Sequence, residues 1–225
     1  MNDIRDTYSA VDSKNNPIDL KLVELFNKKE NGFYIELGAN TGLNVSNTAL
    51  LEAKYNWTGI LIEPSTWGCE ECKKNRPNNI ILQYACVSND FESSVVDGDF
   101  VDGHPMASIG QTRRSTDNNG NPPGHETVPA TTLEKILDEH LPENKQIDFL
   151  SLDTEGYEYN ILKGMNLKKY SPTYVLIEIY IDDFIKIVDL MLSNNYILHS
   201  CITNFNHIDN PIWDGTCNDY LFIKL

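Results

Sequence analysis

Four carboxylates stand at or near the carboxyl ends of predicted strands, where they could take part in binding or acid–base chemistry. Each closes or follows a short apolar run, and together they are Glu36, Glu63, Asp153 and Glu178. Burying a charge in a strand costs on the order of several kcal/mol unless the charge is paired or hydrogen-bonded. In an open α/β sheet, the carboxyl edge of the strands is also where ligands bind. Four acids at that edge therefore favour a functional site over four separate helix caps or surface charges.

Glu63 has the most specific interpretation of the four. It stands about 20 residues beyond a glycine turn, Gly38-Ala-Asn-Thr-Gly42, and an acid at that spacing can accept hydrogen bonds from two ribose hydroxyls of an adenosine cofactor. A loop that binds pyrophosphate carries a further glycine in the middle of the turn. Here Ala39 and Asn40 would crowd a pyrophosphate. The turn therefore favours a cofactor without phosphate, of which S-adenosylmethionine is the common one, over a dinucleotide.

The elements that must position these acids alternate between strand and helix along the chain. The predicted strands are 33–37, 57–63, 79–87, 147–153, 174–180, 196–201 and 220–225, and the predicted helices are 18–26, 45–54, 66–75, 131–140, 155–164 and 182–194. This rhythm predicts an α/β fold with a mostly parallel, doubly wound seven-stranded sheet. We expect residues 1–31 to form an N-terminal arm and helix, and residues 32–225 to form a single domain.

The segment 88–129 interrupts this alternation and is predicted to be an insertion that serves as a lid. Long insertions in compact domains are usually functional or disordered. The insertion carries His104 and His125, whose imidazoles titrate near neutrality and could supply a base. Arg113, with the arginine that follows it, could clamp an anionic group of a substrate, and Tyr180 could stack on a sugar face. For the loop residues, an ordinary solvated surface role stays open.

Composition excludes several classes of protein. The chain has 225 residues, enough for one α/β domain. Acids outnumber bases by 33 to 18, and the formal charge of −15 repels phosphate backbones and anionic membrane surfaces. The N-terminus lacks the apolar core of a secretion signal, and no apolar run is long enough to span a bilayer. We therefore expect a soluble, cytoplasmic protein without nucleic-acid or membrane partners. Five cysteines at irregular spacing predict reduced thiols.

Several short motifs lie at the ends of the predicted strands. They are the glycine turn with its acid (36–42), Gly-Ile-Leu-Ile-Glu-Pro (59–64), Ser-Asn-Thr at the start of the first helix (46–48), and Asp-Thr-Glu-Gly-Tyr-Glu (153–158) with a glycine at 164. Together these segments resemble the FkbM family of methyltransferases, and the similarity covers about residues 32–180. The resemblance implies a Rossmann-like methyltransferase fold, S-adenosylmethionine, and O-methylation, often of a sugar or natural-product hydroxyl. The family's first-strand acid is commonly Asp, and Glu36 keeps that charge on a longer side chain.

The resemblance also implies a set of cofactor-binding residues. They are Glu36, Gly38, Ala39, Asn40, Gly42, Ser46, Asn47, Thr48, Glu63, Pro64, Cys86, Val87 and Ser88. The glycine turn would shape the methionine pocket above Glu36, and residues 46–48 would meet the cofactor's carboxylate with the help of the helix dipole. Glu63 would hold the ribose. Cys86 and its next two neighbours would frame the adenine, although a buried packing role stays the alternative for this cysteine.

Asp153 and Glu155 are the candidates for general base and acceptor anchor. Methyl transfer to oxygen is an in-line displacement, and a base that accepts the hydroxyl proton is worth roughly 10²–10⁴-fold. Glu178 could instead join both acids in holding a divalent ion such as Mg²⁺, which would lower the pKa of the hydroxyl. We expect a small-molecule or glycan acceptor, and a homodimer is left open. Two other classes stay open: an inactive methyltransferase-like interaction module and an NAD-dependent nucleotide-sugar oxidoreductase.

Overall fold

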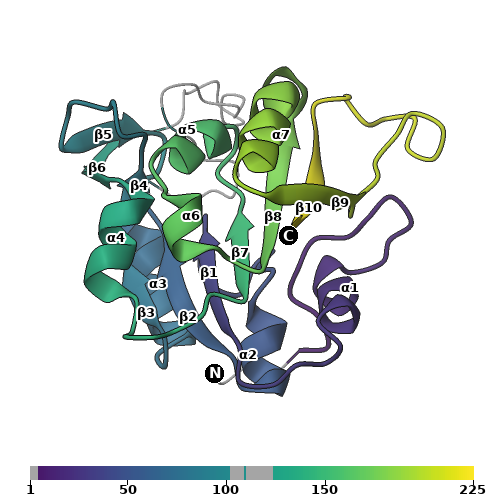
Figure 1. The fold of residues 1–225 in the computed structure, drawn as a ribbon, viewed down its shortest axis with the longest axis horizontal. Coiled ribbons are helices and arrows are strands. Elements are labelled where there is room, and N and C mark those ends of the chain that lie inside the picture. Colours follow the sequence, from purple (N-terminus) through teal and green to yellow (C-terminus); the bar gives the residue numbers. More distant parts are fainter. Residues whose placement is uncertain (1–4, 102–108, 110–123) are drawn as a thin grey trace.

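A central seven-stranded sheet runs through the molecule (Figure 1). The computed structural model describes residues 5–101, 109 and 124–225 of the chain. In spatial order the strands are β3 (Ile80–Leu82), β2 (Thr58–Ile62), β1 (Phe33–Leu37), β7 (Phe149–Leu152), β8 (Tyr174–Tyr180), β10 (Cys217–Lys224) and β9 (Tyr196–Cys201). The strands from β3 to β8 pair in parallel, whereas β10 is antiparallel to both of its neighbours. The prediction of a mostly parallel, doubly wound sheet is therefore confirmed.

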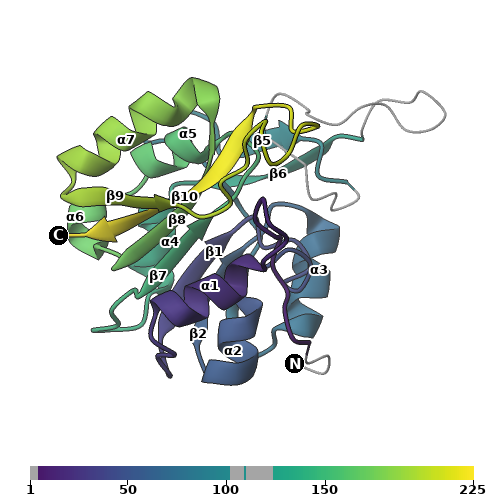
Figure 2. The same ribbon diagram turned by 90° about the vertical axis from the view of Figure 1, so that its right-hand side faces the viewer.

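Helices cover both faces of this sheet (Figure 2). On one face lie α1 (Ile18–Leu25), α2 (Ala49–Tyr55) and α3 (Thr66–Asn75), and on the other lie α4 (Leu133–His140), α5 (Glu158–Lys163), α6 (Leu167–Tyr170) and α7 (Phe184–Ser193). Successive side chains of a strand point to opposite faces. Accordingly, Ile35 of β1 packs with α4 and α5, whereas Tyr34 packs with α1 and α2. Tyr8 of the N-terminal arm joins the second of these clusters.

A second, three-stranded sheet lies beside the carboxyl edge of the first. It consists of β4 (Ala85–Cys86), β6 (Glu126–Thr131) and β5 (Val95–Gly98), in that order. The predicted continuous strand 79–87 is therefore wrong, because the chain leaves the central sheet after Leu82. The last ladder bond of β3 joins the Glu63 N–H to the Leu82 carbonyl, and Pro64 has no N–H with which to extend the pairing. Part of the predicted lid, 88–129, thus forms β-structure with its own apolar cluster.

Four predicted helices begin later than expected, and each delay has a local cause. In place of 131–140, α4 begins at Leu133, because Thr132 is its N-cap and its hydroxyl accepts from the Lys135 N–H. In place of 45–54, α2 begins at Ala49, because Val45 has a left-handed φ of 50°, which no residue of a right-handed α-helix has. In place of 155–164, α5 begins at Glu158, because Glu155 also has a positive φ, 58°. A 3₁₀ turn, η1 (Ile181–Asp183), precedes α7. Among the helices of the described residues, none combines the length and apolar composition that crossing a bilayer requires.

Candidate active site

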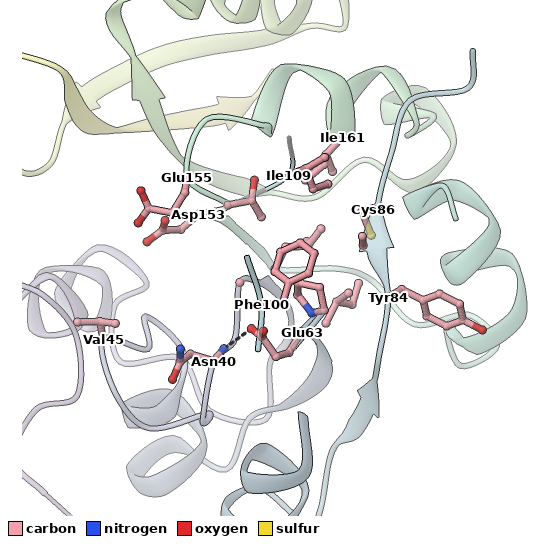
Figure 3. Close-up of a pocket in the computed structure, with 16 residues that line it drawn as sticks. Asn40, Val45, Glu63, Tyr84, Cys86, Phe100, Ile109, Asp153, Glu155 and Ile161 are labelled. Atoms are coloured by element: carbon pink, nitrogen blue, oxygen red, sulfur yellow. Dashed lines mark hydrogen bonds between the residues drawn. The ribbon is translucent and has the colours of Figure 1, made fainter. Parts of the chain in front are cut away.

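A cavity opens at the carboxyl edge of the sheet, between the ends of β1, β2 and β7 and the small sheet (Figure 3). It encloses about 730 Å³ of empty space, including its open mouth. Carboxylates of Asp153 and Glu155 lie at one end, and the side chains of Tyr84, Cys86 and Phe100 lie toward the other. An apolar wall with a few convergent polar groups is typical of small-molecule sites.

The glycine turn forms the floor of the cavity and depends on glycine at both of its ends. Gly38 and Gly42 have φ values of 76° and 77°, in the region that glycine adopts without strain. A Cβ atom on Gly38 would lie 1.8 Å from the carbonyl oxygen of Asp153. The Gly38 N–H donates to the Ile62 carbonyl at 3.1 Å. The turn therefore brings the ends of β1, β2 and β7 into direct backbone contact, and Gly38 and Asn40 line the cavity.

Glu63 lies on the cavity wall just after β2, with both carboxylate oxygens held by the backbone. Oε2 accepts from the Asn40 N–H at 2.7 Å (Figure 3), and Oε1 accepts from the Ser65 N–H at 2.8 Å. Burial raises the pKa of Glu63 to about 7, against the opposing effect of these two bonds. Glu63 and the glycine turn therefore lie side by side on the cavity wall, joined by the bond between Glu63 and Asn40.

Asp153 and Glu155, which follow β7, form a cluster with Glu178 of β8 at the end of the cavity away from Tyr84 and Cys86. Carboxylate oxygens of Asp153, Glu155 and Glu178 lie within 4.8 Å of one another. The Tyr180 hydroxyl donates to Glu155 Oε2 at 2.6 Å, and the Cys217 thiol donates to Glu178 Oε1 at 3.3 Å. Glu178 Oε2 is buried and has no hydrogen-bond partner among the described residues.

Burial and mutual repulsion hold these carboxyls toward their protonated forms. The pKa of Asp153 is raised well above its ordinary range, first by burial and then by the neighbouring charges of Glu155 and Asp219. The pKa of Glu178 is raised for the same reasons, with Asp153 as its main charged neighbour. Burial also raises the pKa of Asp219 to about 6. These carboxyls therefore keep protons that an ordinary surface carboxylate would have lost, and one of them must ionise before it can act as a general base.

Glu36 does not line the cavity. Its carboxylate points into the loop before α2, where it accepts from the Ser46 hydroxyl at 3.0 Å, from the Asn47 N–H at 2.9 Å and from the Thr48 hydroxyl. The four residues therefore form a closed polar group behind the glycine turn. The Asn47 side chain continues this group to the Ser151 hydroxyl on β7, at 3.1 Å.

The remaining predicted site residues fall in several places. Pro64 and Cys86 line the cavity, whereas Ala39, Val87 and Ser88 are buried beside it without forming its wall. His125 lies just before β6, away from the cavity wall. His104 and Arg113 lie outside the described residues.

The apolar wall of the cavity has no signature in the sequence. Phe100 and Ile109 come from the insertion, and Tyr84 lies in the middle of what was predicted to be one strand. Aromatic and aliphatic residues of this kind are read as core from sequence, so no motif could have distinguished them. Only the route of the chain out of the central sheet brings them to the cavity.

The sheet order, the glycine turn and the acid that follows β2 define a Rossmann-like α/β protein of the methyltransferase class. The family model described as the methyltransferase FkbM domain matches residues 36–198. The chain belongs to this family, and the resemblance seen in its motifs is confirmed.

Several solved methyltransferase structures are similar at low sequence identity. A magnesium protoporphyrin IX methyltransferase from Synechocystis, solved with bound S-adenosylmethionine, is 8% identical, with 92% of this chain and 76% of that chain covered and a TM-score of 0.48. A TehB-like S-adenosylmethionine-dependent methyltransferase from Corynebacterium glutamicum is 8% identical (92% and 88% covered, TM-score 0.47). An S-adenosylmethionine-dependent methyltransferase from Aquifex aeolicus is 11% identical, with 92% of this chain and 89% of that chain covered and a TM-score of 0.45. No curated protein sequence matches the chain.

Proposed function

We propose that this protein is an S-adenosylmethionine-dependent O-methyltransferase that acts on a hydroxyl of a sugar, a glycan or a related small polar metabolite. One observation carries the proposal. The glycine turn, Glu63 and the acids Asp153 and Glu155 line one continuous cavity, so a cofactor site and a candidate base adjoin each other. When bound, the cofactor supplies an activated methyl group.

The residues present suit S-adenosylmethionine. Glu63 offers a carboxylate at the spacing expected for the two ribose hydroxyls. Gly38 and Asn40 would hold the methionine end of the cofactor. Residue 38 must be glycine here, because a Cβ atom would collide with the carbonyl oxygen of Asp153. Cys86 and Phe100 provide an apolar wall for the adenine. The carboxylates at the methionine end also favour the positive charge of a sulfonium group.

Asp153 and Glu155 are the residues to which we assign the base and the acceptor anchor. A buried carboxyl with a raised pKa is a stronger base when ionised than an ordinary surface carboxylate. Glu155 is oriented by the Tyr180 hydroxyl, which fits an anchoring role. In this assignment Tyr180 acts indirectly, by holding Glu155 in place beside the acceptor. Residues of the segment 88–129 are proposed to complete the acceptor site.

A divalent ion at the same acids is the second candidate. Three carboxylates within 4.8 Å, one with a buried oxygen that lacks a partner among the described residues, suit the oxygen ligands that Mg²⁺ prefers. Such an ion would lower the pKa of the acceptor hydroxyl. Dialysis against EDTA distinguishes the two candidates. Unchanged turnover supports a carboxylate base, whereas loss of turnover that added Mg²⁺ restores supports the ion.

The acceptor is proposed on the charge and polarity of the chain. A formal charge of −15 disfavours nucleic acid and anionic membranes as partners and is compatible with a neutral polar acceptor in the cytoplasm. Incubation with labelled S-adenosylmethionine and panels of free sugars, nucleotide sugars and glycans tests this directly. Transfer of label to none of them, with transfer to another class of metabolite, would replace the sugar assignment.

Two alternative functions make different predictions for the same cavity. An inactive interaction module would bind the cofactor weakly or not at all and would transfer no label. An NAD-dependent oxidoreductase would bind NAD, for which the turn lacks the middle glycine of a pyrophosphate loop. Calorimetric titration with S-adenosylmethionine and with NAD separates these alternatives.

A further inference from the structure

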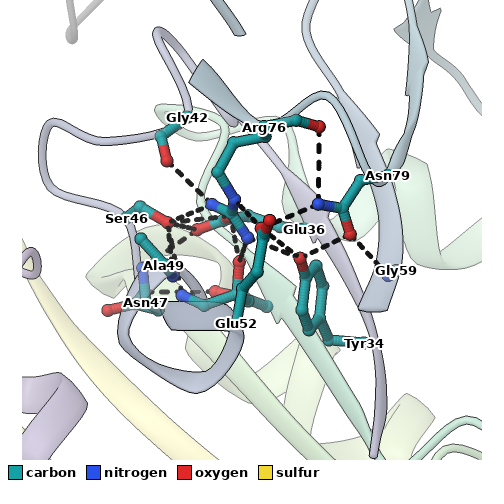
Figure 4. Close-up of polar contacts among 12 residues, drawn as sticks. Tyr34, Glu36, Gly42, Ser46, Asn47, Ala49, Glu52, Gly59, Arg76 and Asn79 are labelled. Carbon is teal, nitrogen blue, oxygen red and sulfur yellow. Dashed lines mark hydrogen bonds and ion pairs between the residues drawn. The ribbon is translucent and has the colours of Figure 1, made fainter. Parts of the chain in front are cut away.

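Arg76 is a fully buried arginine directly behind the glycine turn (Figure 4). It follows the last residue of α3 and is 0% exposed. Arginine is almost never buried to this extent unless its guanidinium is paired. The residue is not on the cavity wall, so its burial calls for an explanation other than ligand contact.

One side of the guanidinium holds the glycine turn and the loop that follows it. Nη1 donates to the Gly42 carbonyl at 2.7 Å and to Ser46 Oγ at 3.4 Å. Nη2 donates to Thr48 Oγ1 at 3.2 Å, and Nη1 lies 4.0 Å from a carboxylate oxygen of Glu36. One planar group therefore joins the end of the turn to the polar group around Glu36.

The other side of the guanidinium is anchored to rigid elements. Nε pairs with the Glu52 carboxylate on α2, and Nη2 donates to the Tyr34 hydroxyl on β1. Asn79 reinforces both partners, because its Nδ2 donates to Glu52 at 2.7 Å and its Oδ1 accepts from the Tyr34 hydroxyl at 2.7 Å. Asn79 Oδ1 also accepts from the Gly59 N–H on β2. The guanidinium is therefore fixed by α2, β1 and β2 before it reaches the turn.

From this geometry we infer that Arg76 is a positioning residue for the cofactor site. It fixes the Gly42 carbonyl and the Ser46–Thr48 loop, and so keeps the Asn40 N–H directed at Glu63. Glu36 belongs to the same network, where it is a buried acidic partner of Arg76, and it does not contact the cofactor. The inference rests on the proposed cofactor site. Lysine cannot replace arginine here, because it lacks the planar fork that serves several acceptors at once.

The test is to measure S-adenosylmethionine binding and steady-state kinetics for Arg76→Lys. We expect the Kd and the KM for the cofactor to rise about 10-fold, the scale of losing a charge-assisted hydrogen bond, with kcat at saturating cofactor within about twofold. A purely structural arginine would reduce the active fraction, and so the apparent kcat, without changing KM. An unchanged Kd in a folded Arg76→Lys protein would overturn the inference.

The matched control is Tyr196→Phe on β9, which removes a buried hydrogen bond to the Pro172 carbonyl, outside the Arg76 network and the cavity wall. We expect it to lower the melting temperature and leave the cofactor Kd unchanged. If Arg76→Lys does not fold, Thr48→Val replaces it, since it removes one hydroxyl between Arg76 and Glu36. We then expect a smaller rise in Kd in the same direction, and an unchanged Kd would equally overturn the inference.

Hydrogen exchange separates this inference from the proposed function. Arg76→Lys should speed amide exchange within residues 40–48 and leave β1 unchanged, whether or not the cofactor binds. Equal exchange in 40–48 for both proteins would reject positioning by Arg76. Failure of the wild-type protein to bind S-adenosylmethionine would instead reject the proposed function.

Discussion

The α-carbon of Gly38 lies against the carbonyl oxygen of Asp153, so closely that a Cβ atom there would be 1.8 Å from that oxygen. This contact joins the turn proposed to bind the methyl donor to the first residue of the acid cluster. Since the two residues belong to the ends of neighbouring parallel strands, β1 and β7, their separation is fixed by the sheet. This backbone contact therefore keeps the proposed cofactor turn and the proposed base next to each other.

Gly38→Ala should break this contact. Alanine at a φ of 76° costs about 1–2 kcal/mol, and its Cβ must push the two strand ends apart. We expect a loss of at least about 10-fold in cofactor affinity, measured by calorimetry, together with lower stability toward urea. Gly124→Ala is the control, because its Cβ would meet only the Val101 side chain at 3.1 Å. Equal affinity for Gly38→Ala and wild type would show that the close approach is unimportant for binding.

Glu63 should make the stability of the unliganded protein depend on pH. Its pKa in the folded protein is about 7, above the ordinary value of 4.5. A carboxyl raised in this way contributes stability below about pH 4.5, and that contribution is lost as the pH rises through about 7. Relative to wild type, Glu63→Gln should therefore gain up to about 3 kcal/mol of stability between pH 5 and pH 8.5.

Urea denaturation of both proteins at the two pH values measures this difference. Glu70→Gln is the control, because it removes the same charge from an exposed position on α3 outside the cavity wall. A stability difference between Glu63→Gln and wild type that does not change with pH would contradict a raised pKa at Glu63.

Asp153→Asn should abolish methyl transfer while leaving cofactor binding largely intact. The amide cannot accept the acceptor's proton, and a missing base costs roughly 10²–10⁴-fold in turnover. Because the pKa of Asp153 is raised by burial and by Glu155, wild-type turnover should increase with pH as the cluster ionises. Asp138→Asn, an exposed acid on α4 paired with Lys169, is the control and should keep full activity. Unchanged turnover in Asp153→Asn would remove this residue from the mechanism.

Much of the fold could be predicted because local pattern and tertiary structure agree. The strands 33–37, 174–180 and 196–201 and the helix 66–75 have the predicted bounds, since each is a clear apolar run or a well-capped helix between turn residues. The acids at the strand ends were found by the same logic, because the carboxyl ends of parallel strands meet at one edge.

What could not be predicted depends on contacts between distant residues. The sequence pattern predicts a helix at Val45. In the structure this residue lies in a loop, whose path is set by the hydrogen bonds of Ser46 and Thr48 to Glu36. The sequence predicts no role for Arg76, because its partners Glu52 and Tyr34 lie 24 and 42 positions away in the chain. No local pattern distinguishes such an arginine from a solvated one at the end of a helix.

The central claim is that this cavity binds S-adenosylmethionine through Glu63. Isothermal titration of the wild-type protein and of Glu63→Ala with S-adenosylmethionine, and of the wild type with NAD, tests it most directly. We expect low-micromolar binding of S-adenosylmethionine to the wild type, loss of that binding in Glu63→Ala, and no heat with NAD. Absence of heat with S-adenosylmethionine, or equal affinity in Glu63→Ala, would contradict the claim.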